Sequence, residues 1–287
     1  MKFSVLLSLY HKESPLFLFK SLCSIFSQTL LPDEVVLVED GPLTPELYEV
    51  VEEFVHEHPE MKRVVLEKNK GLGEALNEGL KHCSHDLVAR MDTDDITKPK
   101  RFEKQVKIFQ KHPEVDVVGS WIDEFEGDIL HVVSVRRLPE CHEDILSFAK
   151  KRNPINHPVV MFRKGAVFAA GGYQHFPLFE DYYLWVRMLM NGAKFYNIQE
   201  SLLYFRSSPD MFKRRGGLKY VGTEVRFQNF LLRSHFISFV YECKLPDDFE
   251  IDNGERKMGD AGYLEWHDKY PNDMLKVHEF YKKYFKK

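Results

Sequence analysis

The apolar positions of the first hundred residues alternate between two patterns. Short runs of β-branched and aliphatic residues, typical of strands, are separated by stretches with the three-to-four-residue apolar spacing of helices. The first helix has a recognisable start, because Ser14 can cap it and Pro15 loses no needed N–H at the first helical position. The pattern predicts strands at 3–9, 34–38, 62–66 and 87–91, and helices at 14–28, 44–58 and 71–82.

This alternation predicts an α/β fold with a mostly parallel central sheet flanked by helices. In such folds the crossovers are right-handed, and ligands bind in the crevice beyond the carboxyl ends of the strands. Candidate functional residues should therefore follow directly after each predicted strand. The segments found there are 10–13, 39–41, 68–71 and 92–95, and three of the four contain carboxylates.

After residue 98 the pattern is more mixed, and a length of 287 residues allows one large α/β domain with appended segments. We expect the domain to span residues 1–215 and a C-terminal helical extension to cover 216–287. Hydrophobic residues make up 44% and charged residues 29% of the chain, which is ordinary for a folded globular protein. The predicted helices of this half lie near 100–111, at 142–150 and at 179–190, and the strands at 115–120, 129–135, 158–162 and 202–205.

Charge and hydropathy narrow the range of partners. The formal net charge of -4 gives no field that would attract nucleic acid, so we expect no polynucleotide partner. No apolar run approaches the roughly 18 residues of a membrane span, and the N-terminus lacks the charged region and cleavage site of a signal peptide. We therefore expect a cytoplasmic protein. Its four cysteines form no CxxC pair, which argues against a zinc site or a disulfide framework.

The strongest local signal is the run Asp92-Thr93-Asp94-Asp95 at the end of the fourth predicted strand. Side chains two apart on an extended segment point the same way, so Asp92 and Asp94 can present hard oxygen ligands together. A divalent cation bound there would neutralise the charge on a diphosphate leaving group. The alternative is an Asp-rich turn that caps the helix beginning near Pro99.

Three further segments carry groups that could bind or react. Asp40 could accept hydrogen bonds from a nucleobase or ribose, with Gly41 allowing a sharp turn, although a plain turn fits equally well. The segment 69–73 loosely resembles a phosphate loop. Glu180 and Asp181 stand among aromatic residues where a helical pattern begins, so they could supply a general base or simply stabilise the helix N-terminus.

Taken together, these segments resemble the family 2 glycosyltransferases, which have the GT-A (Rossmann-like) fold. The resemblance covers about residues 1–210, and the order and spacing of the segments agree as a set. The matching segments are 3–10, 36–41, 69–77, 92–95, 171–173 and 180–181. The resemblance implies a nucleotide-sugar-binding half over residues 1–98 and an acceptor half over 99–215.

The resemblance also implies a role for each matching residue. Asp40 would contact the nucleobase, Asp92 would lie near the ribose and diphosphate, and Asp94 would be the main protein ligand of Mg²⁺ or Mn²⁺. Asp181 would be the catalytic base of an inverting transfer, in which the acceptor hydroxyl attacks in line as the nucleoside diphosphate leaves. The other residues expected at the nucleotide sugar are Ser8, Tyr10, Glu13, Asn69, Gly71 and Thr93, and those expected on the acceptor side are Glu180 and His157.

By the same resemblance we expect a UDP-sugar as the favoured donor, a glycan or lipid-linked saccharide as the acceptor, and a role in surface polysaccharide biosynthesis. The lysine- and aromatic-rich tail at 276–287 could contact an anionic membrane, which would bring the protein to the inner face of the membrane, or could form a solvated helix. For His157, a structural histidine is the alternative to acceptor lining.

One departure from the family pattern affects the donor site. Many relatives carry Ala-Arg-Asn where this chain has Ala75-Leu76-Asn77. A donor-facing arginine is therefore missing at that place. The candidates to replace it are Arg101, Arg206 and the basic loop 213–215.

Two other functions remain open from the residues alone. A sugar nucleotidyltransferase would also bind a diphosphate through a metal, but it needs a glycine- and basic-rich signature near the first strand, which residues 8–13 lack. A non-catalytic nucleotide-sugar-binding protein would not need both Asp94 and Asp181. The leading hypothesis is therefore an enzyme, a metal-dependent hexosyltransferase.

Overall fold

The computed structural model describes residues 1–207 together with Thr223, Phe227 and Phe230. Within these residues the elements follow the predicted order, from a first strand that begins at Phe3 to a last strand that ends at Arg206. The segments predicted further on lie outside the described residues: they are the basic loop 213–215, the helical extension 216–287 apart from the three residues just named, and the tail 276–287.

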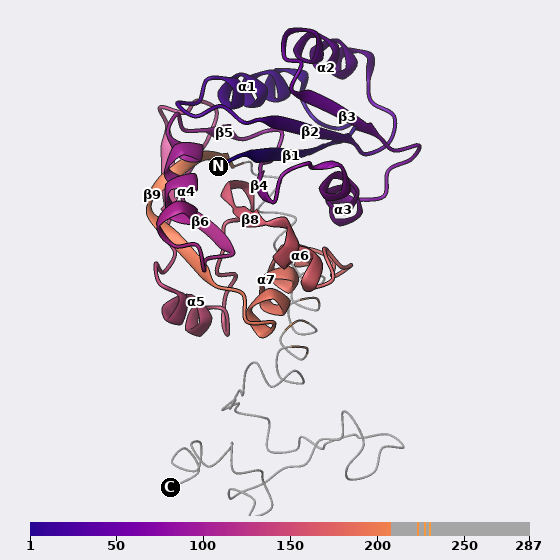
Figure 1. Ribbon diagram of the computed structural model, residues 1–287. Coiled ribbons are helices and arrows are strands. Elements are labelled where there is room, and N and C mark those ends of the chain that lie inside the picture. The colour runs from indigo at the N-terminus through magenta and orange to yellow at the C-terminus, as the bar shows by residue number, and fades with distance from the viewer. Residues whose placement is uncertain (208–222, 224–226, 228–229, 231–287) are drawn as a thin grey trace, which may run out of the picture. The chain divides into compact units, whose positions relative to one another are not determined.

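The first half of the chain forms the predicted alternation of strands and helices (Figure 1). Strands β1 to β4 pair in parallel in the order β3-β2-β1-β4, so their carboxyl ends meet at one edge of the sheet. The bounds are β1 Phe3–Leu9, α1 Pro15–Phe26, β2 Glu34–Glu39, α2 Pro45–Glu57, β3 Met61–Val65, α3 Leu72–His82 and β4 Leu87–Arg90. The parallel, helix-flanked sheet is therefore confirmed for this half.

The second half extends the sheet with strands of both directions. β8 pairs antiparallel with β4, and the order continues β8-β6-β9-β5, with β7 paired to β6. The bounds are β5 Ile96–Thr97, α4 Arg101–Lys111, β6 Val117–Phe125, β7 Val132–Arg136, α5 His142–Phe148, the 3₁₀ turn η1 His157–Val159, β8 Met161–Arg163, α6 Lys164–Ala169, α7 Glu180–Met190 and β9 Phe195–Arg206. Because β5 follows β4 closely in sequence but pairs with β9, the turn between β4 and β5 is held beside the end of β9.

Four strands of the second half differ from the prediction: β6 spans Val117–Phe125 instead of 115–120, β7 spans Val132–Arg136 instead of 129–135, and two others differ more. The strand expected at 158–162 is η1 followed by the short β8, because Pro158 has no N–H to contribute to a ladder. The strand expected at 202–205 begins already at Phe195, since it pairs with β6 along most of its length. Polar residues such as Asn197 interrupt the apolar alternation there, and β5 and α6 are too short to give a periodic signal.

Helices cover both faces of the parallel half of the sheet. α1 and α2 lie on one face (Figure 1), where Leu18 of α1 belongs to the same buried cluster as Val5 and Leu7 of β1. α3 lies on the other face and approaches the sheet closely at Gly79, where a Cβ would lie 2.3 Å from Leu6 Cδ1. β1, β2 and β4 are thereby buried on both faces, whereas the edge strand β3 is partly exposed, and the polar groups that follow the strands are left at the carboxyl edge.

Phe227 packs onto α7, although it lies within the predicted helical extension. Its side chain is fully buried, and its ring centroid lies 4.4 Å from that of Tyr182 and 5.4 Å from that of Phe179. At least this residue beyond position 215 therefore contributes to the core around α7. The boundary at 215 stays a prediction.

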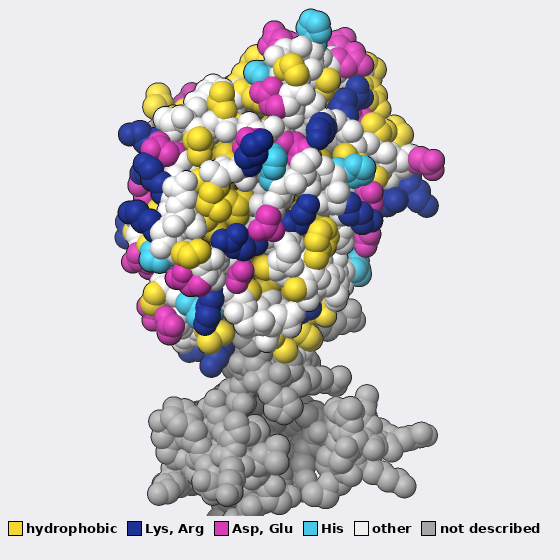
Figure 2. All heavy atoms as spheres, viewed as in Figure 1, with side chains coloured by type: hydrophobic (Ala, Val, Ile, Leu, Met, Phe, Trp, Pro, Cys, Tyr) yellow, Lys and Arg dark blue, Asp and Glu magenta, His cyan; other side chains and the backbone are white. Residues whose placement is uncertain are grey.

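The surface seen in Figure 2 carries interspersed charges. On this face the Lys and Arg side chains of the described residues alternate with Asp and Glu among apolar side chains, without a large field of one sign. Such a face exerts little long-range attraction on a polyanion. None of the described helices combines the length and the apolar character needed to cross a membrane.

Glu34, at the start of β2, is a buried carboxylate surrounded by hydrogen-bond donors. Its Oε2 accepts from Ser4 Oγ (2.6 Å) and Ser84 N (2.7 Å), and its Oε1 accepts from Lys62 Nζ (2.5 Å) and Ser84 Oγ (2.8 Å). Burial alone would raise the pKa of Glu34, but these hydrogen bonds together lower it to about 2. The carboxylate thereby ties β1, β2 and β3 to the residues after α3.

Glu34 should make the fold sensitive to acid. A carboxyl group with a lowered pKa in the folded state stabilises the fold above about pH 4.5, and this contribution is lost as the pH falls toward 2. Glu34→Gln should lower the free energy of unfolding at pH 7 by about 2 to 3 kcal/mol and flatten its dependence on pH in that window. Urea unfolding over a pH series measures this, with the exposed Glu49→Gln as control. Equal acid slopes for wild type and Glu34→Gln would contradict the prediction.

Candidate active site

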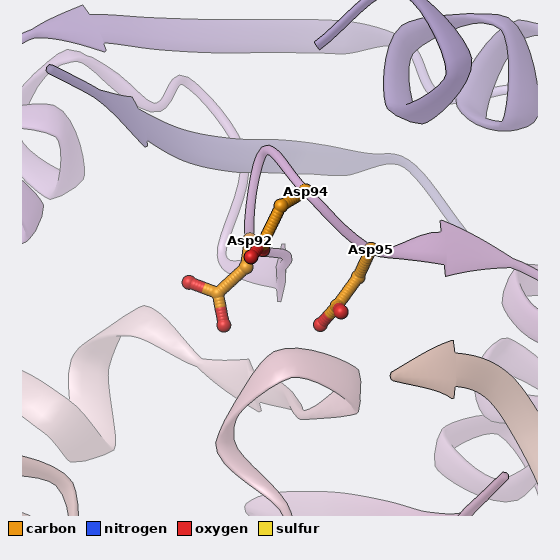
Figure 3. A group of neighbouring side chains, drawn as sticks. All are labelled: Asp92, Asp94 and Asp95. Carbon is orange, nitrogen blue, oxygen red and sulfur yellow. The ribbon is translucent and has the colours of Figure 1, made fainter. Parts of the chain in front are cut away.

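Three carboxylates gather on the turn between β4 and β5 (Figure 3). One oxygen from each of Asp92, Asp94 and Asp95 lies within 4.8 Å of the others, and the three side chains leave the turn on the same side. The sequence predicted Asp92 and Asp94 at this place. Asp95 joins them as a third, fully buried carboxylate.

Burial and mutual repulsion disfavour the charged state of this acidic turn. Burial, followed by the charges of Asp92 and Glu13, raises the pKa of Asp94 to about 7. Burial and the charges of Asp94 and Asp92 raise the pKa of Asp95 well above its ordinary value. Among the described residues, Asp95 Oδ2 has no hydrogen-bond partner. Three hard oxygen donors with an unpaired buried acceptor fit a divalent cation such as Mg²⁺ or Mn²⁺, which would remove the repulsion.

A buried arginine holds the first carboxylate of the acidic turn. Arg90 Nη1 donates to Asp92 Oδ2 (2.8 Å) and Arg90 Nη2 donates to Asp92 Oδ1, which makes a bidentate pair. Arg90 is not among the site residues expected from the sequence. A signal for it exists, because Arg90 is the one cation in the predicted strand 87–91 and lies two positions before Asp92, on the same side of an extended chain.

Arg101 is wrong as a replacement for the missing donor-facing arginine. It is fully buried behind β4, where its Nη2 donates to the carbonyl oxygens of Arg90 (2.6 Å) and Val160 (3.3 Å). Its Nε donates to Gln105 Oε1 (3.1 Å). Burial, followed by the charge of Arg90, lowers the pKa of Arg101 to about 9. This guanidinium supports the interior and does not face a ligand.

Arg206 lies at the acidic turn, although 112 residues separate it from Asp94. Its Nε donates to the carbonyl oxygen of Asp94 (2.9 Å), and its backbone N–H donates to Asp95 Oδ1 (2.8 Å). Its guanidinium lies over the ring of Phe17, 3.8 Å from the centroid, and 4.6 Å from that of Phe125. Of the two candidate arginines in the described part of the chain, Arg206 is therefore the one beside the carboxylates.

Asp40 fixes the loop that starts α3. Its Oδ1 accepts from Lys70 N (2.7 Å) and its Oδ2 accepts from Gly71 N (3.0 Å), while Asn69 Nδ2 donates to the Asp40 carbonyl oxygen (3.2 Å). Asp40, Asn69 and Gly71 are thus brought together as the sequence predicted. The contact of Asp40 with a nucleobase stays a prediction. Within the protein, its carboxylate already accepts hydrogen bonds from the N–H groups of the loop.

Gly41 allows that loop to pass close to the end of β2. Its φ is +87°, and a Cβ there would lie 2.6 Å from the backbone nitrogen of Asn69. Gly41→Ala should therefore lower the free energy of unfolding by about 2 to 4 kcal/mol, because a left-handed conformation alone costs about 1 to 2 kcal/mol and the backbone must also shift. Gly127→Ala is the matched control, since Gly127 also has a positive φ but has open space around its Cβ position. Equal losses in urea unfolding would contradict the role of the contact.

Glu13 joins the end of β1 to the acidic turn. Its Oε2 accepts from Thr93 Oγ1 (2.9 Å), and its Oε1 accepts from Ser14 N at the start of α1 (2.8 Å). Ser8 is half-buried in β1 and Tyr10 is exposed just after it. The structure therefore brings Glu13 and Thr93 to the carboxylates and leaves Ser8 and Tyr10 at the same strand end, where their donor contacts stay predictions.

The carboxylates expected on the acceptor side begin α7. Asp181 Oδ2 accepts a hydrogen bond from Asn153 Nδ2 (2.7 Å). Burial raises the pKa of Glu180, and the charge of Asp181 adds to the rise. The helix N-terminus stabilises negative charge at both positions. This placement is compatible with a general base and with the helix-stabilising alternative.

His157 is half-buried and lies next to Tyr173. Its Nε2 lies 2.9 Å from Tyr173 Oη, and its ring contacts the ring of Trp185 edge to face at 5.9 Å. Burial, followed by the charge of Arg90, lowers the pKa of His157 well below its ordinary value, so the imidazole is neutral. These contacts fit the structural alternative, and acceptor lining by His157 stays a prediction.

Tyr173 connects the two groups of carboxylates. Burial raises the pKa of Tyr173, and the charges of Asp181 and Asp92 both add to the rise. The phenol therefore lies within the electrostatic field of one carboxylate on α7 and one on the acidic turn. Asn77 anchors its backbone: Asn77 Nδ2 donates to the Tyr173 carbonyl oxygen (2.7 Å), and Tyr173 N donates to Asn77 Oδ1 (2.8 Å). Asn77 thereby joins α3 to the segment 171–173, and Tyr173 lies within the electrostatic field of both Asp181 and Asp92.

The sequence matches known proteins. The family model described as "Glycosyl transferase family 2" matches residues 4–168, more than half of the chain. The UDP-Gal:alpha-D-GlcNAc-diphosphoundecaprenol beta-1,3-galactosyltransferase of Escherichia coli is 42% identical over 238 residues, which cover 83% of this chain and 86% of that protein. The amylovoran biosynthesis glycosyltransferase AmsE of Erwinia amylovora is 44% identical over 238 residues, which cover 83% of this chain and 88% of that protein.

A solved structure agrees with the fold. The S. aureus protein TarS, residues 1–349 in complex with UDP-GlcNAc, matches with a TM-score of 0.62 over 82% of this chain and 69% of that chain. At 17% identity this likeness shows the fold alone, and it confirms the predicted GT-A architecture. The family match does not support the sugar nucleotidyltransferase alternative. The chain is a glycosyltransferase, with relatives in bacterial polysaccharide and lipid-linked glycan biosynthesis, and it belongs to glycosyltransferase family 2.

Proposed function

We propose that this chain transfers a sugar from a UDP-sugar to a hydroxyl group of a lipid-linked saccharide, with inversion at the anomeric carbon. The observation that carries the proposal is the arrangement of Asp181 and the acidic turn 92–95 around Tyr173. The acidic turn can hold the diphosphate through a cation, and Asp181 can accept a proton. These are the two needs of a single displacement at a sugar.

In this proposal Asp181 acts as the base. Its carboxylate accepts the proton of the acceptor hydroxyl while that oxygen bonds to the anomeric carbon from the face opposite the diphosphate. The bond from the anomeric carbon to the diphosphate oxygen breaks in the same step, and its electron pair leaves with UDP. Arg206 neutralises part of the charge that develops on the diphosphate.

A divalent cation completes the donor site in this proposal. Asp94 would be its main ligand, with Asp92 and Asp95 beside it. Bound there, Mn²⁺ or Mg²⁺ would supply Lewis-acid stabilisation of the leaving diphosphate. Residues 1–98 would bind the donor and residues 99–215 the acceptor. The donor side would further include Ser8, Tyr10, Glu13, Asp40, Asn69, Gly71 and Thr93, and the acceptor side Glu180 and His157.

The relatives suggest which substrates to test first. The E. coli relative is named for UDP-galactose and a GlcNAc-diphosphoundecaprenol acceptor, and it aligns with most of this chain. We therefore propose UDP-galactose as the first donor to test and a sugar on a polyprenyl diphosphate as the acceptor. A lipid-linked acceptor would bring the enzyme to the inner face of the membrane, and the amylovoran relative supports a role in surface polysaccharide assembly.

The proposal is tested by offering the full chain a panel of donors. The purified protein is incubated with UDP-galactose, UDP-glucose, UDP-GlcNAc or GDP-mannose and a short-chain GlcNAc-diphosphate lipid, with Mn²⁺, Mg²⁺ or EDTA. We expect transfer from one UDP-sugar, loss of transfer in EDTA, and a β-linked product by NMR from the α-linked donor. An α-linked product would overturn inversion. Donor binding without turnover would favour the non-catalytic nucleotide-sugar-binding alternative.

A further inference from the structure

We infer that Asn153 is the positioning residue for the Asp181 carboxylate, an inference that rests on the proposed function. Asn153 lies in the loop between α5 and η1, 28 positions before Asp181. Its side-chain Nδ2 donates to Asp181 Oδ2 at 2.7 Å. A general base must hold its oxygen within hydrogen-bond reach of the proton that it accepts, so a group that fixes its rotation acts on the rate without touching the substrate.

The Asn153 amide has only one orientation that satisfies its neighbours. A carboxylate can only accept hydrogen bonds and a backbone N–H can only donate one. Asn153 Oδ1 accepts from Ile155 N (3.3 Å), so Nδ2 must be the group that faces Asp181. One contact requires a donor and the other an acceptor, so together they fix which end of the Asn153 amide faces Asp181.

The loop that carries Asn153 is anchored to the sheet. Asn156 Nδ2 donates to the carbonyl oxygen of Ser120 in β6 (2.8 Å), and Asn197 Nδ2 in β9 donates to the carbonyl oxygen of Pro154 (3.1 Å). Both contacts are buried. Asn153 therefore stands on a rigid support next to Pro154, which favours a prearranged contact over one that forms by chance.

α7 is held in place from the same side. Tyr182 Oη donates to the carbonyl oxygen of Ala149 (2.7 Å), just after α5 and four positions before Asn153. Because Tyr182 directly follows Asp181, this bond fixes the start of α7 relative to the loop. The loop that carries Asn153 and the helix that carries Asp181 are therefore both held in place, which fixes the distance between the two side chains.

The contact also favours the charged form of Asp181. A hydrogen bond donated to a carboxylate stabilises its anion. Among the described residues, the titratable groups that share this field include Tyr173 from the preceding loop, Glu180 on α7 itself and Asp92, which acts on the same phenol, while the imidazole of His157 beside Tyr173 is neutral. Asp92 and Glu180 carry negative charge when ionised, so Asn153 is a neutral donor that offsets their repulsion.

The test compares Asn153→Ala and Asn153→Asp with wild type in sugar transfer. Both variants should lower kcat roughly 10- to 100-fold and leave the KM of the donor nearly unchanged. The acidic limb of the pH–rate profile should move to higher pH, and further in Asn153→Asp, because that variant replaces a donor with a second carboxylate. Such a shift is a signature that a merely structural role would not produce.

Asn191→Ala is the matched control. Asn191 caps the other end of α7, is exposed, and donates from Nδ2 to the carbonyl oxygen of Ala169 (3.0 Å), far from Asp181 in the helix. This variant should keep the wild-type kcat and pH profile. Thermal unfolding and binding of UDP with Mn²⁺ show whether each variant is folded.

Two outcomes would overturn the inference, and a third would refute the function on which it rests. An unchanged kcat and acidic limb in both Asn153 variants would show that Asp181 does not depend on this contact. Loss of activity together with loss of UDP binding and a large fall in Tm would show that Asn153 only supports the fold. Absence of transfer in wild type would instead refute the proposed function, which distinguishes the two failures.

Discussion

Asp94→Ala should lower the kcat of sugar transfer roughly 10³-fold or more. Asp94 is the middle member of three carboxylates whose oxygens lie within 4.8 Å of one another. Its removal takes away the main proposed ligand of the cation, whereas the bidentate pair of Arg90 with Asp92 remains to hold the turn. The measurement is the initial rate at saturating donor over a Mn²⁺ titration, together with Mn²⁺ binding in the presence of UDP.

Asp144→Ala is the control for the loss of an acidic residue. Asp144 is exposed in the first turn of α5, where it accepts a hydrogen bond from Cys141 Sγ. This variant should keep both the rate and the Mn²⁺ titration of wild type. If Asp94→Ala bound Mn²⁺ and transferred sugar as wild type does, the acidic turn would not be the cation site.

Asp181→Asn should lower kcat roughly 10³-fold while UDP binding stays at the wild-type level. The introduced amide has the shape of the carboxylate, and its oxygen can still accept the hydrogen bond from Asn153 Nδ2. It cannot take a proton from the acceptor hydroxyl at ordinary pH. The measurements are kcat with donor and acceptor at saturation, and the Kd of UDP with Mn²⁺ by calorimetry.

Glu143→Gln tests whether the effect of Asp181→Asn comes merely from a helix N-terminus. Glu143 is an exposed carboxylate in the first turn of α5, so its removal changes the same kind of interaction with a helix dipole. Its kcat should equal that of wild type. Full activity of Asp181→Asn would leave the helix-stabilising role as the explanation of Asp181 and would remove the proposed base.

The sequence was most informative where the signal is local. The apolar runs of β1 and β2 and the helical spacing of α3 predicted these elements to within about one or two residues, because burial on both faces leaves a continuous apolar strand. The Asp run could be located in the same way, because the buried strand β4 ends just before it. A position directly after a parallel strand places a residue at the ligand edge whatever the rest of the fold does.

Pairing between distant segments was not visible in the sequence. β9 begins at Phe195 because β6 provides hydrogen-bonding partners along most of its length, although Asn197 breaks the apolar alternation. Arg101 and Arg206 look equally available in the sequence. Burial behind β4 removes the first, and the pairing of β5 with β9 brings the second to Asp94.

The sequence by itself determined the fold class, the strand ends that carry the candidate site and the two carboxylate groups that the proposed reaction needs. The tertiary structure alone decided that Asn153 holds the Asp181 carboxylate and that Asn77 holds the segment of Tyr173. The physical reason is that periodicity reports whether a position is buried, whereas the partner of a buried polar group depends on which elements pack together. The contacts of Asn153 with Asp181 and of Asn77 with Tyr173 join residues 28 and 96 positions apart, and no local pattern encodes such a distance.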